Sequence, residues 1–302
     1  MIRIGTRKSP LALWQANAVK IELEAQGFES VLIPIESEGD QNLKVPLYQM
    51  GIQGIFTKSL DTALLNNKID LAVHSLKDVP TQMPEGIIVG GVLARGAAHD
   101  IFVAHPKQSV DLEKVIGTGS LRRKAQWLRK YPEYTVKNLR GNLQKRLEKL
   151  SQSSWSGAVF AAAGFERMGF DSVNYTTLDW MIPAPAQGII GISCLTSSKF
   201  EDILDQINDK STALCAQIER SFLATLEGGC TAPIGALATL QNQTVKFKGG
   251  LFSLQGSNAI IIEETVPLEE GQKIGIKMAN QILNEGGSDL LQQIKVELNK
   301  AK

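Results

Sequence analysis

Two stretches of the sequence share one layout: Ile4-Gly5-Thr6-Arg7-Lys8-Ser9 and Ile116-Gly117-Thr118-Gly119-Ser120-Leu121. Each begins as a short apolar strand, passes through a glycine turn and reaches a serine that can cap the helix behind it. The surrounding chain alternates short apolar runs with helical patterns, which is typical of a parallel sheet with crossover helices. We therefore expect two sister α/β units, although two short matches do not by themselves establish a repeat.

The chain is expected to form three domains. The two α/β domains are placed at 1–94 together with 188–206, and at 98–182, with a proline-containing crossing between them. After about residue 210 the pattern changes to a helix, two alternating strands and further helices, so 210–302 is expected to be a smaller α+β domain. Because backbone N–H groups at a helix start bind anions, the paired helix starts indicate a ligand held between the first two domains.

The net charge of +1 hides an uneven distribution of charge. The segment 114–149 holds eleven Lys and Arg residues against Glu133 and Glu148, so it carries +9 and the remainder carries −8. Such a concentration is typical of a protein with an anionic partner, whether nucleic acid, phosphate or a polycarboxylate. A solvated helix face explains the same charge equally well, so charge alone leaves both interpretations open.

Cysteine use and hydropathy bear on the compartment. The three cysteines, Cys194, Cys215 and Cys230, are an odd number without CxxC spacing, which favours a reducing compartment and argues against a disulfide framework or a metal site. The first residues form no apolar signal region, and no apolar run approaches the ~20 residues that span a bilayer. We expect a cytoplasmic protein without a membrane partner.

Cys230 lies on a glycine-paired loop, Leu226-Glu227-Gly228-Gly229-Cys230-Thr231, directly after a predicted helix. Gly228 provides the usual helix stop, so the thiol follows a helix C-terminus. The partial negative charge at that end disfavours a thiolate, which is unlike the setting of a fast catalytic nucleophile. Cys230 is therefore interpreted as an attachment point.

Polar residues follow the buried strand at 69–73, which continues as His74-Ser75-Leu76-Lys77-Asp78. The C-terminal ends of strands face the ligand crevice in open α/β sheets. Asp78 is thus a candidate general acid/base or cation stabiliser, and Lys77 a candidate carboxylate ligand. The alternatives are a Lys77–Asp78 surface turn and, for His74, an ordinary core histidine.

Arginines gather at the starts of two predicted helices, where Ser120 precedes Arg122 and Arg123, and where Arg140 precedes Arg146. Guanidinium groups grip carboxylates bidentately, so several at helix starts would orient a polyanion. Arg7 and Lys8 add to this set from the first domain. Nucleic acid is a weaker alternative, because few aromatic residues are interleaved with the basic ones and no nucleic-acid-binding motif is present.

Six strings in order give the chain a resemblance that runs nearly from end to end. They are Ile4-Gly-Thr-Arg-Lys-Ser-Pro-Leu-Ala-Leu-Trp-Gln-Ala16, Val73-His-Ser-Leu-Lys-Asp-Val-Pro80, Gly117-Thr-Gly-Ser-Leu-Arg-Arg123, Leu139-Arg-Gly-Asn142, Pro183-Ala-Pro-Ala-Gln-Gly188 and Leu226-Glu-Gly-Gly-Cys-Thr-Ala-Pro-Ile-Gly235. With these strings the chain resembles the porphobilinogen deaminase, or hydroxymethylbilane synthase, family. The resemblance implies two α/β domains similar to periplasmic binding proteins, with a smaller third domain that reaches into the cleft between them.

The resemblance also implies a function. It implies a monomeric transferase of tetrapyrrole biosynthesis that condenses four porphobilinogen molecules with loss of ammonia, then releases hydroxymethylbilane. A dipyrromethane cofactor would be held in a thioether by Cys230, and Asp78 would act as the acid/base group. By the same resemblance, cofactor contacts would come from Lys77, Asp78, Thr118, Gly119, Ser120, Arg122 and Arg123. Substrate contacts would come from Arg7, Ser9, Arg140, Arg146 and Gln187.

Four positions depart from the commoner family pattern: Glu38, Gln53, Ser59 and Gly119. The first three lie in or beside the glycine-punctuated segment 37–56, which shows neither period and is expected to be a mobile loop. They put in doubt how that loop closes over the ligand. Two other classes of function remain as hypotheses: a non-enzymatic anion-binding protein with the same two lobes, and an RNA-binding protein that uses 114–149.

Overall fold

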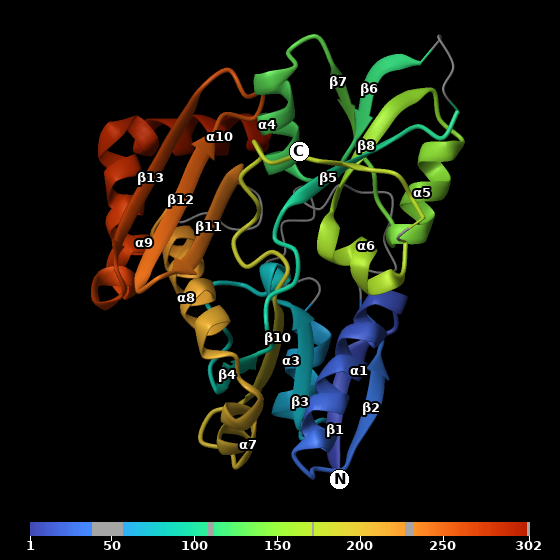
Figure 1. Cartoon of the computed structure of the whole chain (residues 1–302), viewed down its shortest axis with the longest axis vertical. Helices are drawn as coiled ribbons and strands as arrows, with labels where there is room; N and C mark the ends of the chain where they lie inside the picture. The colour runs from blue at the N-terminus through green and yellow to red at the C-terminus, as the bar shows by residue number, and fades with distance from the viewer. Residues whose placement is uncertain (38–56, 108–111, 171, 227–231, 301–302) are drawn as a thin grey trace.

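The structure, a computed structural model, describes residues 1–37, 57–107, 112–170, 172–226 and 232–300. These residues form three sheets, one in each of three bodies (Figure 1). Lobe 1 lies at the bottom of that view, lobe 2 at the upper right in green, and the C-terminal unit at the left in orange and red. The predictions for Glu38, Gln53, the loop 38–56 and Cys230 concern residues outside the described ones.

Lobe 1 is built on a five-stranded sheet in the order β2-β1-β3-β10-β4. Its strands are β1 (Ile2–Arg7), β2 (Ser30–Ile35), β3 (Leu71–Ser75), β4 (Ile87–Val92) and β10 (Ile190–Leu195). Its helices are α1 (Pro10–Ala25), α3 (Lys58–Leu65), the 3₁₀ turn η2 (Leu76–Asp78) and α7 (Phe200–Ile207). Helix α1 begins as the sequence predicts, because the Ser9 side chain accepts a hydrogen bond from the Ala12 N–H.

The apolar face of α1 provides the core of lobe 1. Ala16, Val19 and Leu23 are fully buried at helical spacing, and they pack against Leu71 and Val73 of β3. Helix α3 buries Leu60 and its neighbours in a second cluster that includes Ala72. Leu71 and Val73 thus enter one cluster and Ala72 the other, which is why the first three residues of β3 are all apolar.

Lobe 2 is built on a second five-stranded sheet, in the order β7-β6-β8-β5-β9. Its strands are β5 (Asp100–Ala104), β6 (Glu113–Gly117), β7 (Thr135–Lys137), β8 (Trp155–Ala161) and β9 (Thr176–Thr177). Its helices are α4 (Leu121–Lys130), α5 (Leu143–Ser151) and α6 (Ala162–Met168). Serine again starts a helix, since the Ser120 side chain accepts from the Arg123 N–H at the start of α4.

The two lobes share one topology. In lobe 1, β1 is parallel to β2 and β3, and β10 is antiparallel to β3 and β4. In lobe 2, β6 is parallel to β7 and β8, and β5 is antiparallel to β8 and β9. The sister units expected from the paired glycine turns are therefore confirmed at the level of strand pairing. Each lobe also receives one strand across a connection from the other, so two chain segments link the lobes.

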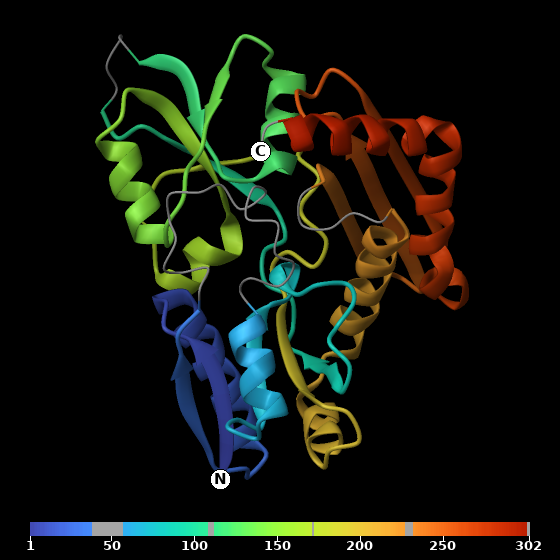
Figure 2. The same cartoon turned by 180° about the vertical axis from the view of Figure 1, so that it is seen from behind.

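The C-terminal unit has helices over a three-stranded antiparallel sheet, β11-β12-β13 (Figure 2). Its elements are α8 (Lys210–Thr225), β11 (Ile234–Gln241), β12 (Thr244–Phe252), β13 (Ala259–Pro267), α9 (Leu268–Ile282), η3 (Leu283–Gly287) and α10 (Ser288–Lys300). The sequence predicts β12 and β13 but misses β11, which begins inside one of the family strings. The α/β fold class with a smaller α+β unit is confirmed, whereas the residue boundaries of the three domains stay predictions.

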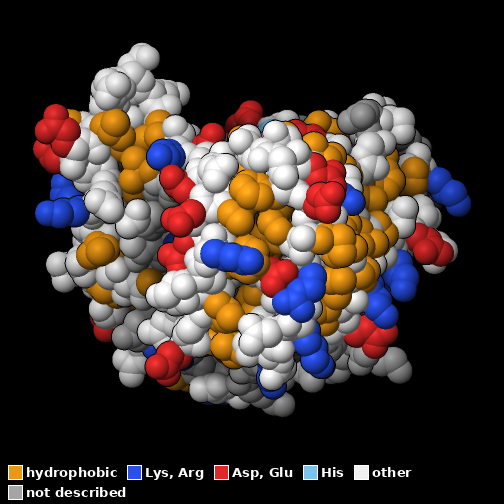
Figure 3. Space-filling model, turned by 90° about the horizontal axis from the view of Figure 1, so that it is seen from below, with side chains coloured by type: hydrophobic (Ala, Val, Ile, Leu, Met, Phe, Trp, Pro, Cys, Tyr) orange, Lys and Arg blue, Asp and Glu red, His pale blue; other side chains and the backbone are white. Residues whose placement is uncertain are grey.

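The visible surface at the lower end of lobe 1 carries no patch of charges of a single sign. Seen from below, acidic, basic and apolar side chains are interspersed over the visible face (Figure 3). Within the described residues, no helix has the length and apolar character needed to cross a membrane. Of the eleven Lys and Arg residues in 114–149, five line a cavity between the lobes.

Candidate active site

A cavity of about 590 Å³ lies where the two lobes face each other. Its walls are the start of α1 after β1, the end of β3 with η2, the start of α4, the start of α5, and the connection at 184–189. The cavity brings together most of the residues that the sequence proposed for the site: Arg7, Ser9, Lys77, Asp78, Gly119, Ser120, Arg122, Arg123, Arg140, Arg146 and Gln187. The sequence therefore predicted a set of residues that the fold gathers from five places in the chain.

Two of the proposed residues stand apart from this set. Thr118 is buried and does not line the cavity; its Oγ1 accepts a hydrogen bond from the Ser120 N–H, so it supports the turn. Cys230 lies in 227–231, outside the described residues. Helix α8 ends at Thr225 and Leu226 is its buried C-cap residue, in agreement with the predicted helix before the cysteine loop.

Positive side chains dominate among the charged residues that line the cavity. Nine of its described lining residues are cations: Arg7, Lys8, Lys77, Arg122, Arg123, Arg140, Lys145, Arg146 and Arg167. Asp78 is the one acidic residue among the described residues that line it. The cavity therefore suits a ligand with several negative charges.

Burial and neighbouring cations lower the pKa values of two basic side chains that line the cavity. Burial, followed by the charges of Arg123, Arg140 and Arg7, lowers the pKa of Arg146 to about 10 against a raising effect of Asp78. Burial likewise lowers the pKa of Lys77 to about 8, although Asp78 opposes that shift. Anionic ligand groups would relieve both penalties, because an opposite charge favours the charged form of each cation.

Asp78 ends the 3₁₀ turn η2, which extends β3 toward the cavity. The turn is fixed by the Leu76 N–H, which donates to the Ile189 carbonyl at 3.0 Å, and by the Val79 N–H, which donates to the Leu76 carbonyl at 3.1 Å. Leu76 is buried, while Lys77 and Asp78 are half-buried toward the cavity. The surface-turn interpretation of Lys77 and Asp78 is therefore wrong for their placement, since both line the interlobe cavity.

His74 is the buried residue before this turn, as the core interpretation expects. Burial, with the nearby charge of Arg7, lowers the pKa of His74 to about 4, so the ring is neutral at physiological pH. The ring still borders the cavity, and its Nε2 has no hydrogen-bond partner among the described residues.

Asp100 organises the arginines at the start of α4, and sequence analysis missed it. Its carboxylate is fully buried at the first position of β5 and accepts from Arg122 Nη1 at 2.7 Å and from Arg123 Nε at 2.9 Å. Burial alone would raise the pKa of Asp100, but the charges of Arg122 and Arg123 outweigh it and hold that pKa well below its usual range. Two cations and one anion leave a net positive charge behind the cavity wall.

Gln187 joins this cluster to the other lobe. Its Nε2 donates to Asp100 Oδ1 at 3.0 Å and to the Ala98 carbonyl at 2.7 Å, and its Oε1 lies 3.4 Å from Lys77 Nζ. Lys77 follows the sheet of lobe 1, whereas Asp100 belongs to the sheet of lobe 2. Gln187 therefore holds groups from both lobes at one point of the cavity.

Some basic residues around α5 line the cavity, and another supports them through a hydrogen bond. Arg140 is buried and Arg146 half-buried, and both line the cavity. Lys149 of the same helix does not line it; its Nζ donates to the Arg140 carbonyl at 2.9 Å. Asn142 caps the helix by accepting from the Lys145 N–H at 2.9 Å, which places this basic cluster at a helix start.

Two departures from the commoner family pattern can be placed. Gly119 lines the cavity, and a Cβ built there would lie 3.0 Å from the Leu139 carbonyl oxygen, so the neighbouring backbone leaves little room for a side chain. Ser59 lies half-buried in the first turn of α3 and does not line the cavity. The first departure thus alters the cavity wall directly, and the second does not.

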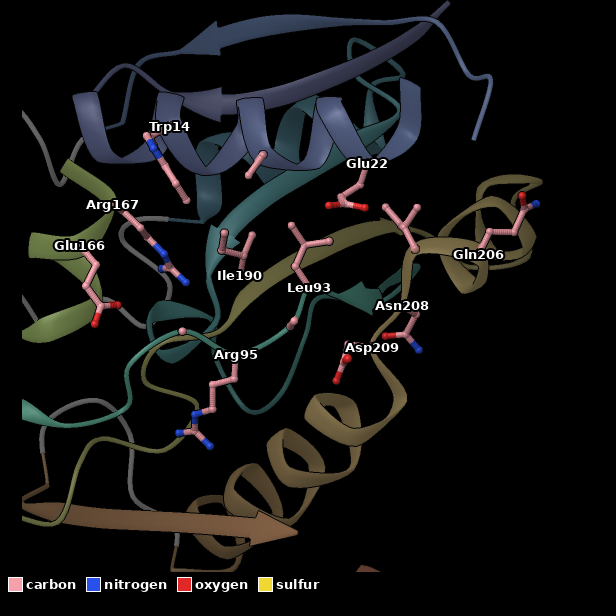
Figure 4. A pocket seen from close by; sticks show the side chains of 14 residues that line it. Trp14, Glu22, Leu93, Arg95, Glu166, Arg167, Ile190, Gln206, Asn208 and Asp209 are labelled. Atoms are coloured by element: carbon pink, nitrogen blue, oxygen red, sulfur yellow. The ribbon is translucent and has the colours of Figure 1, made fainter. Parts of the chain in front are cut away.

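A second cavity, of about 600 Å³, lies on the other side of the interlobe connections (Figure 4). Leu93 and Ile190 form its floor, and charges of both signs surround it. Arg95 lies at its edge and pairs with the fully buried Glu219 of α8, which also accepts from the backbone N–H groups of Ala186 and Ala238. Glu219 thereby ties α8 to both chain segments that link the lobes.

Comparison with known proteins gives the family. The model of the porphobilinogen deaminase dipyromethane cofactor binding domain matches residues 2–201, and that of the porphobilinogen deaminase C-terminal domain matches residues 213–284. The porphobilinogen deaminase of Geotalea uraniireducens is 40% identical over 300 residues, which cover 97% of this chain and 94% of that protein. The chain belongs to the porphobilinogen deaminase family.

Other comparisons give a second family member and two solved structures. The porphobilinogen deaminase of Desulfitobacterium hafniense is 39% identical over 307 residues, which cover 99% of each protein. Among solved structures, the periplasmic VFT2 domain of Bordetella pertussis BvgS is 10% identical with a TM-score of 0.41, over 68% of this chain and 86% of that one. The periplasmic sulfonate-binding protein SsuA of Methylobacillus flagellatus is 13% identical with a TM-score of 0.36, over 75% of this chain and 68% of that one.

The cofactor named by the family model fits the cavity. A dipyrromethane with acetate and propionate side chains is a polycarboxylate, and the cavity presents nine cations to it. The described residues that line the cavity all fall between Arg7 and Ile189, inside the segment matched by the cofactor binding domain. The described residues of the cavity therefore fit the group that the family model names.

Proposed function

We propose that this chain is a porphobilinogen deaminase that joins four porphobilinogen molecules head to tail, with loss of ammonia, and releases linear hydroxymethylbilane by hydrolysis. The observation that carries the proposal is the interlobe cavity, in which Asp78 is the one acid among nine cations of the described lining residues. Each porphobilinogen brings two carboxylates, so a growing chain needs distributed cations. The cavity supplies them from both lobes.

Asp78 is proposed to perform the acid/base step. When the C–N bond of the substrate aminomethyl group breaks, ammonia leaves with the bonding electron pair and positive charge spreads over the pyrrole ring. A carboxylate fixed beside the ring stabilises that charge as it develops, and it accepts the proton released when the next bond has formed. No other acid among the described lining residues can take this role.

The cations are proposed to hold and orient the carboxylates. Arg7 and Ser9, at the start of α1, would bind substrate side chains from lobe 1, while Arg140, Arg146 and Gln187 would bind them from the opposite wall. Arginine forks bind carboxylates with fixed direction, which brings each incoming pyrrole to Asp78 in one orientation.

The cofactor side of the cavity is proposed to consist of Lys77, Asp78, Thr118, Gly119, Ser120, Arg122 and Arg123, with Thr118 acting through the turn. Asp100 holds the two arginines in place, so their remaining N–H groups keep a fixed direction. Cys230 is proposed as the covalent attachment point. When bound, the dipyrromethane would supply the nucleophilic pyrrole carbon to which the first substrate is joined.

We also propose that the enzyme works as a monomer in the cytoplasm, with porphobilinogen as its substrate and neither nucleic acid nor a membrane as a partner. The family resemblance supports these statements. Light scattering of the purified protein tests the first, and fractionation of cells that express it tests the second.

The function is tested by the stoichiometry of the reaction. Purified protein is incubated with porphobilinogen, and consumed substrate, released ammonia and the linear product are measured by mass spectrometry and a chemical ammonia assay. We expect one ammonia for each porphobilinogen consumed, and one linear tetrapyrrole for four. Porphobilinogen that binds and is recovered unchanged would instead identify a two-lobed anion-binding protein.

A further inference from the structure

Helix α8 contacts the loop that carries Asp78 in two ways: Ala216 packs in an apolar cluster with Leu76 and Val79, and Arg220 donates hydrogen bonds. Arg220 Nη1 donates to the Val79 carbonyl at 2.9 Å, and Arg220 Nη2 donates to the Pro80 carbonyl at 2.6 Å. A guanidinium is planar and presents parallel N–H groups, so one side chain fixes two successive carbonyls in direction as well as distance.

The Val79 side chain is buried in this cluster, so the backbone carbonyls of Val79 and Pro80 are the part of the loop that Arg220 fixes. Pro80 has no backbone N–H, so the chain cannot continue β3 as a paired strand there. The segment before Asp78 is held by the Leu76 N–H bond to Ile189, and the segment after it is held by Arg220. Asp78 therefore lies between two anchors, one in an interlobe connection and one on α8.

Arg220 itself does not touch the proposed reaction site. It is half-buried and is not among the described residues that line the cavity, so any effect on the reaction passes through the loop. Its helix continues for little more than one turn to Thr225 and then leads into the segment that contains Cys230. The preceding residue, Glu219, binds Arg95 and two backbone N–H groups, which fixes the same turn of α8 against the interlobe connections.

We propose that Arg220 is a positioning residue for Asp78. By holding the Val79 and Pro80 carbonyls, it sets the place of the acid/base carboxylate relative to the helix that leads to the cofactor cysteine. The inference rests on the proposed function, in which Asp78 acts on a chain whose other end is fixed at Cys230. A carboxylate displaced by about 1 Å can cost roughly 100-fold in rate, so such an anchor matters for turnover.

The first experiment compares Arg220→Met and Arg220→Lys holoenzymes with the wild type. Lys210→Met is the matched control, because it removes a cation from the same helix at a position that is exposed and 3.9 Å from its partner Asp205. Cofactor content is measured by intact mass, and kcat and KM for porphobilinogen by initial rates. We expect Arg220→Met to load the cofactor, to keep KM within about twofold and to lower kcat by roughly 10- to 100-fold.

Arg220→Lys separates positioning from folding. A lysine ammonium reaches a carbonyl without the fixed fork, so we expect an intermediate kcat and an unfolding temperature near that of the wild type. If Arg220→Met does not fold, the kcat of Arg220→Lys tests the proposal instead. A kcat equal to that of Lys210→Met in either folded Arg220 variant would overturn the proposal.

The second experiment asks whether Arg220 acts through Asp78. Asp78→Glu moves the carboxylate by one methylene, and Arg220→Met is introduced into that background. Coupled residues give non-additive losses, so the fold-loss from Arg220→Met is expected to be smaller beside Glu than beside Asp. Fully multiplicative losses would overturn the proposal. A wild-type enzyme that releases no ammonia would instead refute the proposed function, so the two failures are distinguishable.

Discussion

Asp78 is distinguished by its surroundings, because among the described residues that line the cavity it is the one carboxylate beside nine cations. The sequence located it correctly at the end of a buried strand, since the strand-end rule depends only on the local pattern. The rule could not reveal Asp100, which looks like an ordinary residue before the apolar run Ile101-Phe102-Val103. The role of Asp100 appears only when the fold brings Arg122 and Arg123 to it.

Replacing Asp78 by alanine is expected to keep the fold and remove catalysis. Loss of a group that stabilises developing charge lowers kcat by about 10²- to 10³-fold or more. Initial rates of ammonia release measure this, and circular dichroism checks the fold. Glu85→Ala is the control, because it removes an exposed carboxylate from the connection that follows the same turn. A turnover of Asp78→Ala close to that of Glu85→Ala would contradict the acid/base role.

Lys77 gives the cavity a pH dependence. Its pKa is lowered to about 8, so in the unliganded protein the side chain is charged below that pH and loses its charge as the pH rises through it. A carboxylate ligand binds the charged form, so affinity is expected to fall above about pH 8. Titration calorimetry of porphobilinogen with Cys230→Ser protein, between pH 7 and 9, measures the effect without the covalent cofactor.

Lys77→Arg is the control for that measurement. Arginine remains charged over the whole range, so the variant is expected to lose less affinity as the pH rises. Equal losses in the two proteins would show that groups other than Lys77 cause the pH dependence.

At the scale of elements, Asp100 joins the first residue of β5 to the first turn of α4. Asp100→Asn would leave two buried guanidiniums without their counter-charge, so we expect the free energy of unfolding to fall by about 3–5 kcal/mol. Urea unfolding followed by tryptophan fluorescence measures the change.

Glu263→Gln is the matched control for Asp100→Asn. Glu263 bridges Lys246 and Lys248 as Asp100 bridges two arginines, but its side chain is 42% exposed. Exposed pairs contribute little, so its replacement is expected to change unfolding much less. Equal effects of the two substitutions would contradict the view that burial gives the Asp100 cluster its strength.

The starts of the helices could be predicted from the sequence, whereas strand β11 could not. Ser9 and Ser120 each cap the helix that the sequence assigned to them, because a cap is a local interaction between a side chain and nearby N–H groups. Strand β11 was missed, since its small residues Gly235, Ala236 and Ala238 carry little strand preference. Its stability as a strand comes from the ladder with β12, which pairs residues that are distant in sequence.

At the scale of the whole molecule, the sequence predicted two sister lobes but could not give the cavity between them. The paired glycine turns indicated the repeat, and matching strand order confirmed it. The cavity depends on two connections and on contacts such as Gln187 with both lobes, which no local pattern encodes. Helix α8 adds further contacts of this kind. Its Glu219 and Arg220 fix the C-terminal unit to the connections and to the Asp78 loop.

The central claim is that this cavity holds a growing pyrrole chain whose fixed end is Cys230. Intact mass under denaturing conditions tests it most directly, with Cys230→Ser and Cys215→Ser compared with the wild type. We predict that the wild type and Cys215→Ser carry the extra mass of a dipyrromethane and gain discrete pyrrole increments with porphobilinogen, while Cys230→Ser has the mass of the bare sequence. A wild-type protein that has the bare mass, and keeps it after incubation with porphobilinogen, would contradict the account.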